Sequence, residues 1–179
     1  MKFCTVTALF LAAACLIGGP VRAQQQPTPP SSATLDVVPE RMPFSTPYGT
    51  PISLEKAQAV LQAALAESNK RGWQLNVAVV DPGGNLLAFA RMDGAQLASI
   101  AIAEHKARAA ARFRRPTRVF EDAIQKGFTY IETLDDVIAS RGGIPLIDDG
   151  KLVGAIGCSG GTGSQDEVIC TAGAATINK

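Results

Sequence analysis

Residues 144–158 read IPLIDDGKLVGAIGC, two apolar runs joined by the turn Asp148-Asp149-Gly150. Residues 73–91, WQLNVAVVDPGGNLLAFAR, repeat this plan around a second turn sequence at residues 81–85. Asp, Asn and Gly accept the positive φ angles of tight hairpin turns, and the β-branched and apolar residues beside them favour strands. We therefore predict two antiparallel hairpins, and we interpret Asp81 as a turn residue rather than a site residue.

Helical patterns surround the two hairpins. Ser53 is placed as a helix cap, the alanine-rich stretch ends before Pro116, and Thr117 is the expected cap of the helix that follows. The order αββααββα lacks the strict alternation of a Rossmann sheet, so the sequence predicts an α/β (α+β) fold, an antiparallel β-sheet with helices packed on it. The predicted helices cover residues 54–71, 97–115, 117 to about 127, and the stretch from the loop at 159–164 to about 178, while residues 128–141 fit neither pattern.

The composition sets limits on the class of protein. The chain has 179 residues, 17 Lys and Arg against 16 Asp and Glu, one His and four Cys. This length indicates a single domain, and the balanced charge gives no reason to expect a nucleic-acid partner. With one His and no CxxC pair, the chain alone cannot build a closed zinc site of the usual Cys/His kind.

The first 51 residues differ from the rest. Lys2, an apolar run and the sequence Val21-Arg22-Ala23 are typical of a cleaved signal peptide at residues 1–23, so we expect a periplasmic or secreted protein. The apolar run is short for a stable membrane insertion, and Cys15 leaves lipidation as an alternative. Residues 24–51 are rich in Pro, Gln and Ser and are predicted to be a flexible leader before a domain at residues 52–179.

Four segments carry a resemblance to a known family. They are VAVVDPGGNLLAFARMDGA (77–95), SIAIAEHKARAAARFRRPT (99–117), GGIPL (142–146) and VGAIGCSGGTGSQDE (153–167). In this order and spacing the chain resembles the GlcG/HbpS family, also called the haem-degrading domain, over residues 53–175. The resemblance implies a profilin-like antiparallel sheet, a homo-oligomer, and haem or a related tetrapyrrole as the bound cofactor. It implies no particular reaction, and whether the protein is an enzyme stays open.

The candidate cofactor site lies around the alanine-rich helix. His105 is the only imidazole in the chain and the strongest nitrogen donor for haem iron, with Lys106 and the Thr117 hydroxyl as weaker alternatives. Arg114 and Arg115 match the geometry of tetrapyrrole propionates. Each residue also has a structural explanation: His105 as a solvated helix residue, and the arginines as cations that the helix C-terminus attracts.

Four further patterns bear on the site, and the first three have two readings each. Arg91 and Asp93 either bind a carboxylate or form an exposed ion pair at a strand end. The loop at 159–167 either receives an anion or, as we favour, is closed by a capping box of Ser164 and Glu167. Cys158 and Cys170 form a disulfide or, the reading we favour, pack as buried thiols. The alanines of residues 99–113 pack tightly on the sheet, with enough left over for a second copy.

The sequence therefore supports an exported small-molecule-binding protein of the GlcG/HbpS type, with haem or a related tetrapyrrole as its ligand. Two alternatives remain. The chain is a cofactor-free sensory or accessory subunit with an extracytoplasmic protein partner, or it is an enzyme that acts on haem or a small hydroxy acid. We identify no Ser/His/Asp or Cys/His catalytic set in the sequence.

Overall fold

The computed structural model describes residues 40–42 and 44–178. The predicted signal peptide and the leader up to residue 39 lie outside the described residues. Both predicted hairpins are present, as β1 (Asn76–Val80) with β2 (Leu86–Arg91) and β3 (Gly143–Asp148) with β4 (Lys151–Ser159). They join into one antiparallel sheet of order β2-β1-β4-β3, with Val77 opposite Cys158 at the central pairing. The predicted α+β fold is confirmed.

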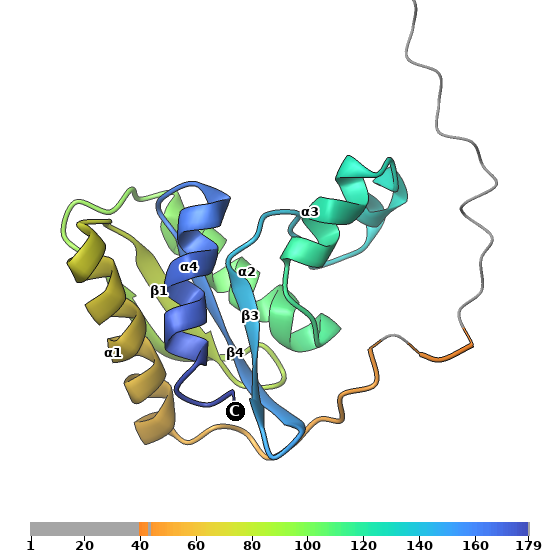
Figure 1. Ribbon diagram of the computed structural model, residues 1–179, viewed down its shortest axis with the longest axis horizontal. Helices are drawn as coiled ribbons and strands as arrows, with labels where there is room; N and C mark the ends of the chain where they lie inside the picture. Colours follow the sequence, from red (N-terminus) through yellow and green to blue (C-terminus); the bar gives the residue numbers. More distant parts are fainter. Residues whose placement is uncertain (1–39, 43, 179) are drawn as a thin grey trace, which may run out of the picture. The chain divides into compact units, whose positions relative to one another are not determined.

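Two helices cover one face of the sheet (Figure 1). They are α1 (Leu54–Arg71) and α4 (Gly163–Ala174). Ser53 caps α1 as predicted, because its hydroxyl accepts a hydrogen bond from the Lys56 amide, and Gly72 ends the helix at a φ of 67° that suits glycine. Between helices and sheet lies the main core, which includes Val60, Val77, Val79, Ile156 and Ile169.

The other face is covered by α2 (Ser99–Phe113), which packs unusually close to the strands (Figure 1). A Cβ at Gly157 would lie 2.1 Å from the Ala103 carbonyl oxygen, and one at Gly143 would lie 2.3 Å from that of Lys106. Alanine on the helix and glycine on the strands therefore serve the same contact. Ala103 and Ala110 are fully buried there, so these two alanines are not available to a second copy, whereas Ala101 is exposed.

Thr117 is the N-cap residue of α3 (Arg118–Gln125), as predicted, but its side chain makes no capping bond. The predicted capping box at the start of α4 is wrong. The cap of α4 is Thr162, whose hydroxyl accepts from the Gln165 amide while the Gln165 side chain accepts from the Thr162 amide. The capping box thus begins two residues before the predicted Ser164, because the helix starts at Gly163. A 3-10 helix at Thr129–Thr133 lies in the stretch that fitted neither pattern.

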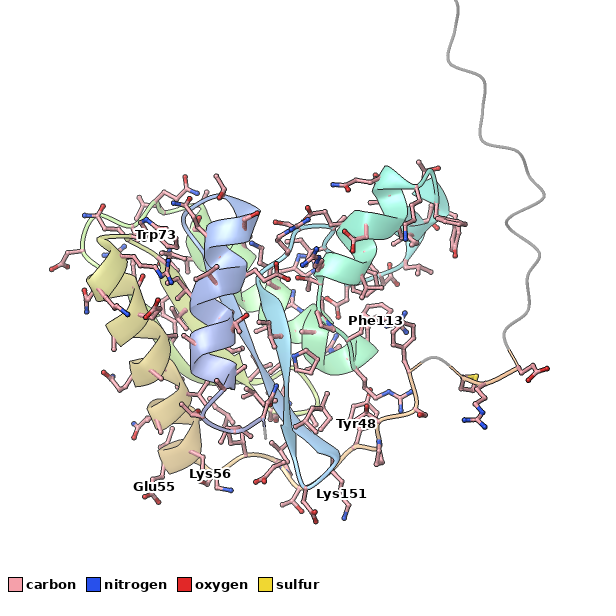
Figure 2. The ribbon with its side chains drawn as sticks, viewed as in Figure 1. Tyr48, Glu55, Lys56, Trp73, Phe113 and Lys151 are labelled. Carbon is pink, nitrogen blue, oxygen red and sulfur yellow. A yellow bond between two sulfur atoms is a disulfide. The ribbon has the colours of Figure 1, made fainter. Side chains whose placement is uncertain are left out.

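The end of the predicted leader contacts the domain. Leu152 of β4 donates its amide hydrogen to the Pro47 carbonyl at 2.9 Å and accepts a hydrogen bond from the Gly49 amide at 2.8 Å. These two bonds pair Tyr48 with Leu152 in a short parallel bridge. The Tyr48 hydroxyl donates to the Arg112 carbonyl, so the ring lies against the end of α2 (Figure 2). Contacts with the domain therefore begin before residue 52. Among the described residues, no helix has the length and apolarity to cross a membrane.

Candidate functional site

His105 lies on the outer face of α2, the face turned away from the sheet. Helical spacing places it in one row with Arg108 and Arg112, three and seven residues further on. The imidazole is half-buried, and its Nε2 atom is enclosed without a hydrogen-bond partner among the described residues. A buried ring nitrogen without a partner costs about 1–3 kcal/mol, so this atom is the most conspicuous unsatisfied group on the helix.

A loop residue binds the same row. Asp136 accepts a hydrogen bond from Arg108 Nε at 2.9 Å and a second from Arg112, while Arg112 Nε donates to the Gly83 carbonyl. The hydrogen bond from Arg108 holds the pKa of the Asp136 carboxyl below its ordinary value. Asp136 adopts a φ of 65°, an uncommon angle for a residue other than glycine. We call this arrangement the Asp136 clasp; it fastens the loop after the 3-10 helix to the outer face of α2.

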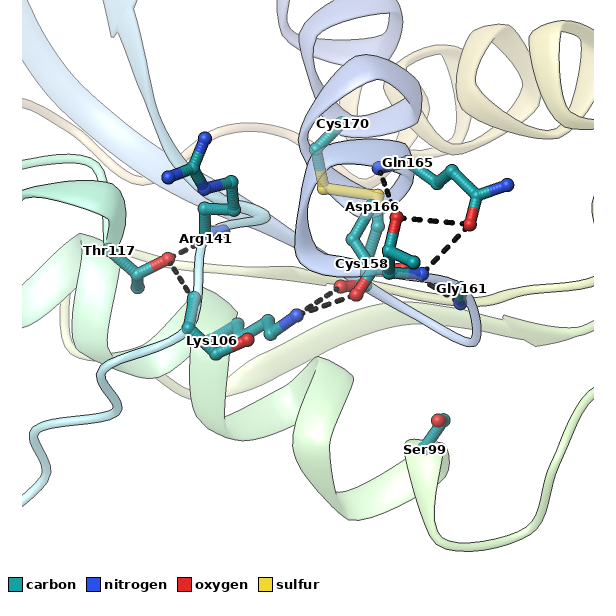
Figure 3. Close-up of polar contacts among 12 residues, drawn as sticks. Ser99, Lys106, Thr117, Arg141, Cys158, Gly161, Gln165, Asp166 and Cys170 are labelled. Carbon is teal, nitrogen blue, oxygen red and sulfur yellow. Dashed lines mark hydrogen bonds and ion pairs between the residues drawn. A yellow bond between two sulfur atoms is a disulfide. The ribbon is translucent and has the colours of Figure 1, made fainter. Parts of the chain in front are cut away.

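Lys106 points the other way, into the protein. Its side chain is 1% exposed, and its Nζ atom lies 2.7 Å from Asp166 Oδ2 and 3.3 Å from the Cys158 carbonyl oxygen (Figure 3). The second oxygen of Asp166 accepts from the Gly161 amide at 3.0 Å. Lys106 is thus committed to a buried ion pair that joins α2 to the start of α4. The carboxylate of Asp166 also uses the loop amide that an anion would need.

Arg114 and Arg115 lie at the C-terminal end of α2, beside the last residues of the leader. Arg114 donates to the Thr46 carbonyl at 3.0 Å, and its guanidinium carbon stands 5.1 Å from the centre of the Tyr48 ring. The Arg115 guanidinium lies 3.3 Å from the centre of the Phe44 ring. Burial, and then the neighbouring charge of Arg114, lowers the pKa of Arg115. Neither guanidinium has a carboxylate within ion-pairing distance in the described part of the chain.

Thr117 is fully buried, and its hydroxyl is satisfied on both sides. It donates to the Ser140 carbonyl at 2.7 Å and accepts from the Gly143 amide at 2.9 Å, which ties α3 to the start of β3. The five predicted site residues therefore do not converge on one cavity. His105 lies on the outer face of α2, Arg114 and Arg115 lie at its end, and Lys106 and Thr117 hold the fold together.

The structure also decides between the readings of the other residues that the sequence singled out. Arg91 and Asp93 form no ion pair with each other or with any other described residue. Asp81 accepts hydrogen bonds from the Asn85 amide and side chain within its turn, as the sequence predicted. Cys158 and Cys170 form a disulfide, with Cα atoms 5.7 Å apart, so the favoured reading of two buried thiols is wrong.

Two residues of structural importance, Asp136 and Asp166, were not singled out by the sequence as partners of α2. Each lies on a segment more than 20 residues from the basic group that it binds, and no local spacing pattern connects them. No group of three or more His, Cys, Asp or Glu side chains able to hold a metal ion occurs among residues 40–42 and 44–178.

Comparison with known proteins gives consistent results. The model of the family of haem-degrading HbpS-like proteins matches residues 52–175. Protein GlcG of Escherichia coli is 38% identical over 108 residues, 60% of this chain and 81% of GlcG.

Solved structures agree with these sequence matches. A crystal structure of a doubly substituted HbpS from Streptomyces reticuli has a TM-score of 0.67 at 32% identity, covering 80% of this chain and 97% of that one. A crystal structure of PduOC in complex with haem has a TM-score of 0.66 at 28% identity, covering 72% and 96%. With a family model matched over most of the domain and the same fold in these structures, the chain belongs to the GlcG/HbpS family of HbpS-like proteins.

Proposed function

We propose that this protein binds haem or a related tetrapyrrole on the outer face of α2, with His105 as the axial ligand. The observation that carries the proposal is the Nε2 atom of His105, a ring nitrogen that is enclosed without a hydrogen-bond partner among the described residues. Imidazole nitrogen is a common axial ligand of haem iron. The haem-bound structure of PduOC, a relative in fold, supports the same class of ligand.

Three of the five predicted residues have a part in this proposal. His105 would donate to the iron, and haem, when bound, supplies a redox-active iron whose potential the axial ligand tunes. Arg114 and Arg115 would pair with the propionate carboxylates, since a guanidinium has five N–H donors and these two use only part of theirs within the described chain. We leave Lys106 and Thr117 out of the ligand set, because both are buried and hydrogen-bonded within the fold.

Access of a haem iron to His105 depends on the groups that enclose its Nε2 atom. Because Nε2 is enclosed, an iron atom reaches it only after the covering groups move. The Asp136 clasp spans the same helix row, so we expect it to resist that movement. Loss of the clasp in an Asp136→Ala variant should therefore speed haemin uptake and leave the ligand unchanged.

Haemin titration tests the proposal. We expect a saturable Soret shift with the unchanged protein and a different or absent shift with His105→Ala, because the axial donor is removed. Arg118→Gln, which removes an exposed arginine on α3, is the matched control and should behave like the unchanged protein. A Soret spectrum unaltered by His105→Ala would remove the ligand assignment, and no Soret change in any protein would remove haem binding.

We also propose that the protein is exported and cleaved after Ala23. The signal-like sequence supports this, and so does the Cys158–Cys170 disulfide, because such bonds persist in oxidising compartments. Intact-mass measurement of protein from an envelope fraction should give a chain that begins at Gln24. Retention of residues 1–23, or a lipid on Cys15, would contradict the proposal.

A homo-oligomer is the third part of the proposal, and the edges of the sheet support it. At the β3 edge, Pro145 lacks an N–H and Asn178 binds both the Ile147 amide and the Pro145 carbonyl. At the β2 edge, Leu86–Ala90 contains neither proline nor charge, and Leu86 is 50% exposed. Such an edge is a ready surface for strand pairing. Light scattering should find more than one chain per particle, and a monomer at tens of micromolar would contradict this part.

One observation favours the cofactor-free alternative. The enclosure of Nε2 is what a structural histidine under a fixed loop would also show. An accessory subunit with a protein partner would then use other surfaces of the domain. The same haemin titration decides between the two functions. The cofactor-free alternative predicts no Soret shift in the unchanged protein and none in the Asp136→Ala variant.

A further inference from the structure

A hollow of about 450 Å³ opens where α1 and β2 end. Its walls come from the last turn of α1, the connection to β1, and the end of β2 with the two residues that follow. This volume lies within the range of small-molecule sites, about 300–1,000 Å³. None of its lining residues belongs to α2, so it is separate from the proposed haem site.

The hollow has an apolar wall that the core holds in place. Leu65, Ala90 and Trp73 line it and also pack against the main hydrophobic core. The Arg71 guanidinium carbon lies 5.1 Å from the centre of the Trp73 ring and restrains the indole from outside the hollow. Figure 2 shows Trp73 at the end of α1, where the chain turns towards β1.

Four polar side chains line the same hollow and have no partner within the described residues. They are Asn69, Gln74, Arg91 and Asp93. Elsewhere in the described chain, Arg108, Arg118 and Arg141 all have carboxylate partners. One free cation and one free anion therefore flank an aromatic wall, two residues apart in the sequence. This combination offers complementary charges to a ligand rather than to the protein itself.

We propose that this hollow binds a small zwitterion of the amino-acid type with an apolar side chain. Arg91 would bind the carboxylate, because a guanidinium fork matches its geometry. Asp93 would bind the ammonium group, and the apolar body would lie against Trp73 and Leu65. A ligand with only one of the two charges would leave the other protein charge unpaired and would bind more weakly.

The test uses three compounds that share one phenyl group. L-phenylalanine has both charges, 3-phenylpropionate has only the carboxylate, and phenethylamine has only the ammonium. Trp73 is the only tryptophan of the chain, so its fluorescence reports on the hollow directly, and calorimetry gives a second measurement. We expect saturable binding of L-phenylalanine and about tenfold weaker binding of the other two. No saturation up to roughly 10 mM by either method would overturn the proposal, as would equal affinity for all three.

Two variants assign the charges. Arg91→Gln should weaken L-phenylalanine binding about tenfold and bring it towards that of phenethylamine, while Asp93→Asn should bring it towards that of 3-phenylpropionate. Both positions are exposed, so the fold should be unaffected, which circular dichroism checks. Arg118→Gln and Asp135→Asn, at exposed positions away from the hollow, are the matched controls and should bind as the unchanged protein does. Unchanged affinity in both Arg91→Gln and Asp93→Asn would overturn the proposal.

Discussion

Replacing Asp166 by alanine should destabilise the protein more than the loss of any surface ion pair. The side chains of Lys106 and Asp166 are 1% and 3% exposed, and their charged atoms are 2.7 Å apart. Removing the carboxylate leaves the Lys106 ammonium in a dry environment, with the Cys158 carbonyl as its one remaining hydrogen-bond partner among the described residues. Breaking a buried pair in this way costs about 3–5 kcal/mol, and we expect Asp166→Ala to fall in that range.

The controls separate burial from pairing. The ion pair between Lys56 and Asp148 has nearly the same length, 2.8 Å, but its side chains are 56% and 44% exposed. Surface pairs of this kind contribute about 0–1 kcal/mol, so Lys56→Gln should have little effect. The double variant Lys106→Met with Asp166→Leu removes both charges and should recover most of the lost stability, because a buried pair replaced by apolar residues is often neutral.

Urea unfolding followed by far-ultraviolet circular dichroism measures all four proteins. The expected order of the free energy of unfolding is the unchanged protein and Lys56→Gln highest, then the double variant, then Asp166→Ala. A loss below about 1 kcal/mol in Asp166→Ala would show that this buried ion pair contributes no more than an exposed one. If Asp166→Ala does not fold at all, the double variant still tests the explanation. A folded double variant would show that the unpaired Lys106 charge causes the loss of stability, and an unfolded one would show that it does not.

Three further predictions concern other parts of the domain. Gly157→Ala should cost at least about 1–3 kcal/mol by thermal unfolding, since its Cβ would meet the α2 backbone. Gly150→Asn should cost less, since its Cβ would lie in open space and asparagine tolerates the φ of +69° better than most residues. Reducing the Cys158–Cys170 disulfide should lower the free energy of unfolding by about 3 kcal/mol, and an equal midpoint in urea with and without reductant would contradict this. The hydrogen bond from Arg141 lowers the pKa of Glu121 below its ordinary 4.5, so this pair stabilises the protein above that pH and is lost as the pH falls through the lower folded value. Melting temperatures from pH 6 downwards should therefore fall less steeply for Glu121→Gln than for the unchanged protein.

The sequence was a good guide wherever the decisive interaction is local. The turn at Asp148-Asp149-Gly150, the Ser53 cap and the Gly72 end of α1 each depend on residues within four positions of one another. The hairpins and helices were therefore predictable, with ends that shift by a few residues. The cap of α4 was predicted two residues late, because Ser164 with Glu167 and Thr162 with Gln165 satisfy the same spacing rule. Only the start of the folded helix selects between them.

The site was less predictable, because it depends on directions that sequence spacing does not give. His105 and Lys106 are neighbours in the chain, yet one lies on the outer face of α2 and the other in the interior. Which face of an alanine-rich helix meets the sheet is decided by Gly143 of β3 and Gly157 of β4, which lie 37 and 54 residues beyond the α2 residues that they contact, Lys106 and Ala103. The same is true of the disulfide, because two readings were open from the sequence and the distance between strand and helix decides between them.

The elements, their order and the family could be predicted from the sequence, since turns, caps and hydrophobic periods act over a few residues. The pairing of the charges could not, because it depends on how the elements pack. Asp166 reaches Lys106, and Asp136 reaches Arg108, across 60 and 28 residues. The tertiary structure also leaves Arg91 and Asp93 near Trp73 without an ion pair to each other. The physical reason is that burial and charge pairing depend on distances in space, and the packing of α2 and α1 on the sheet sets those distances.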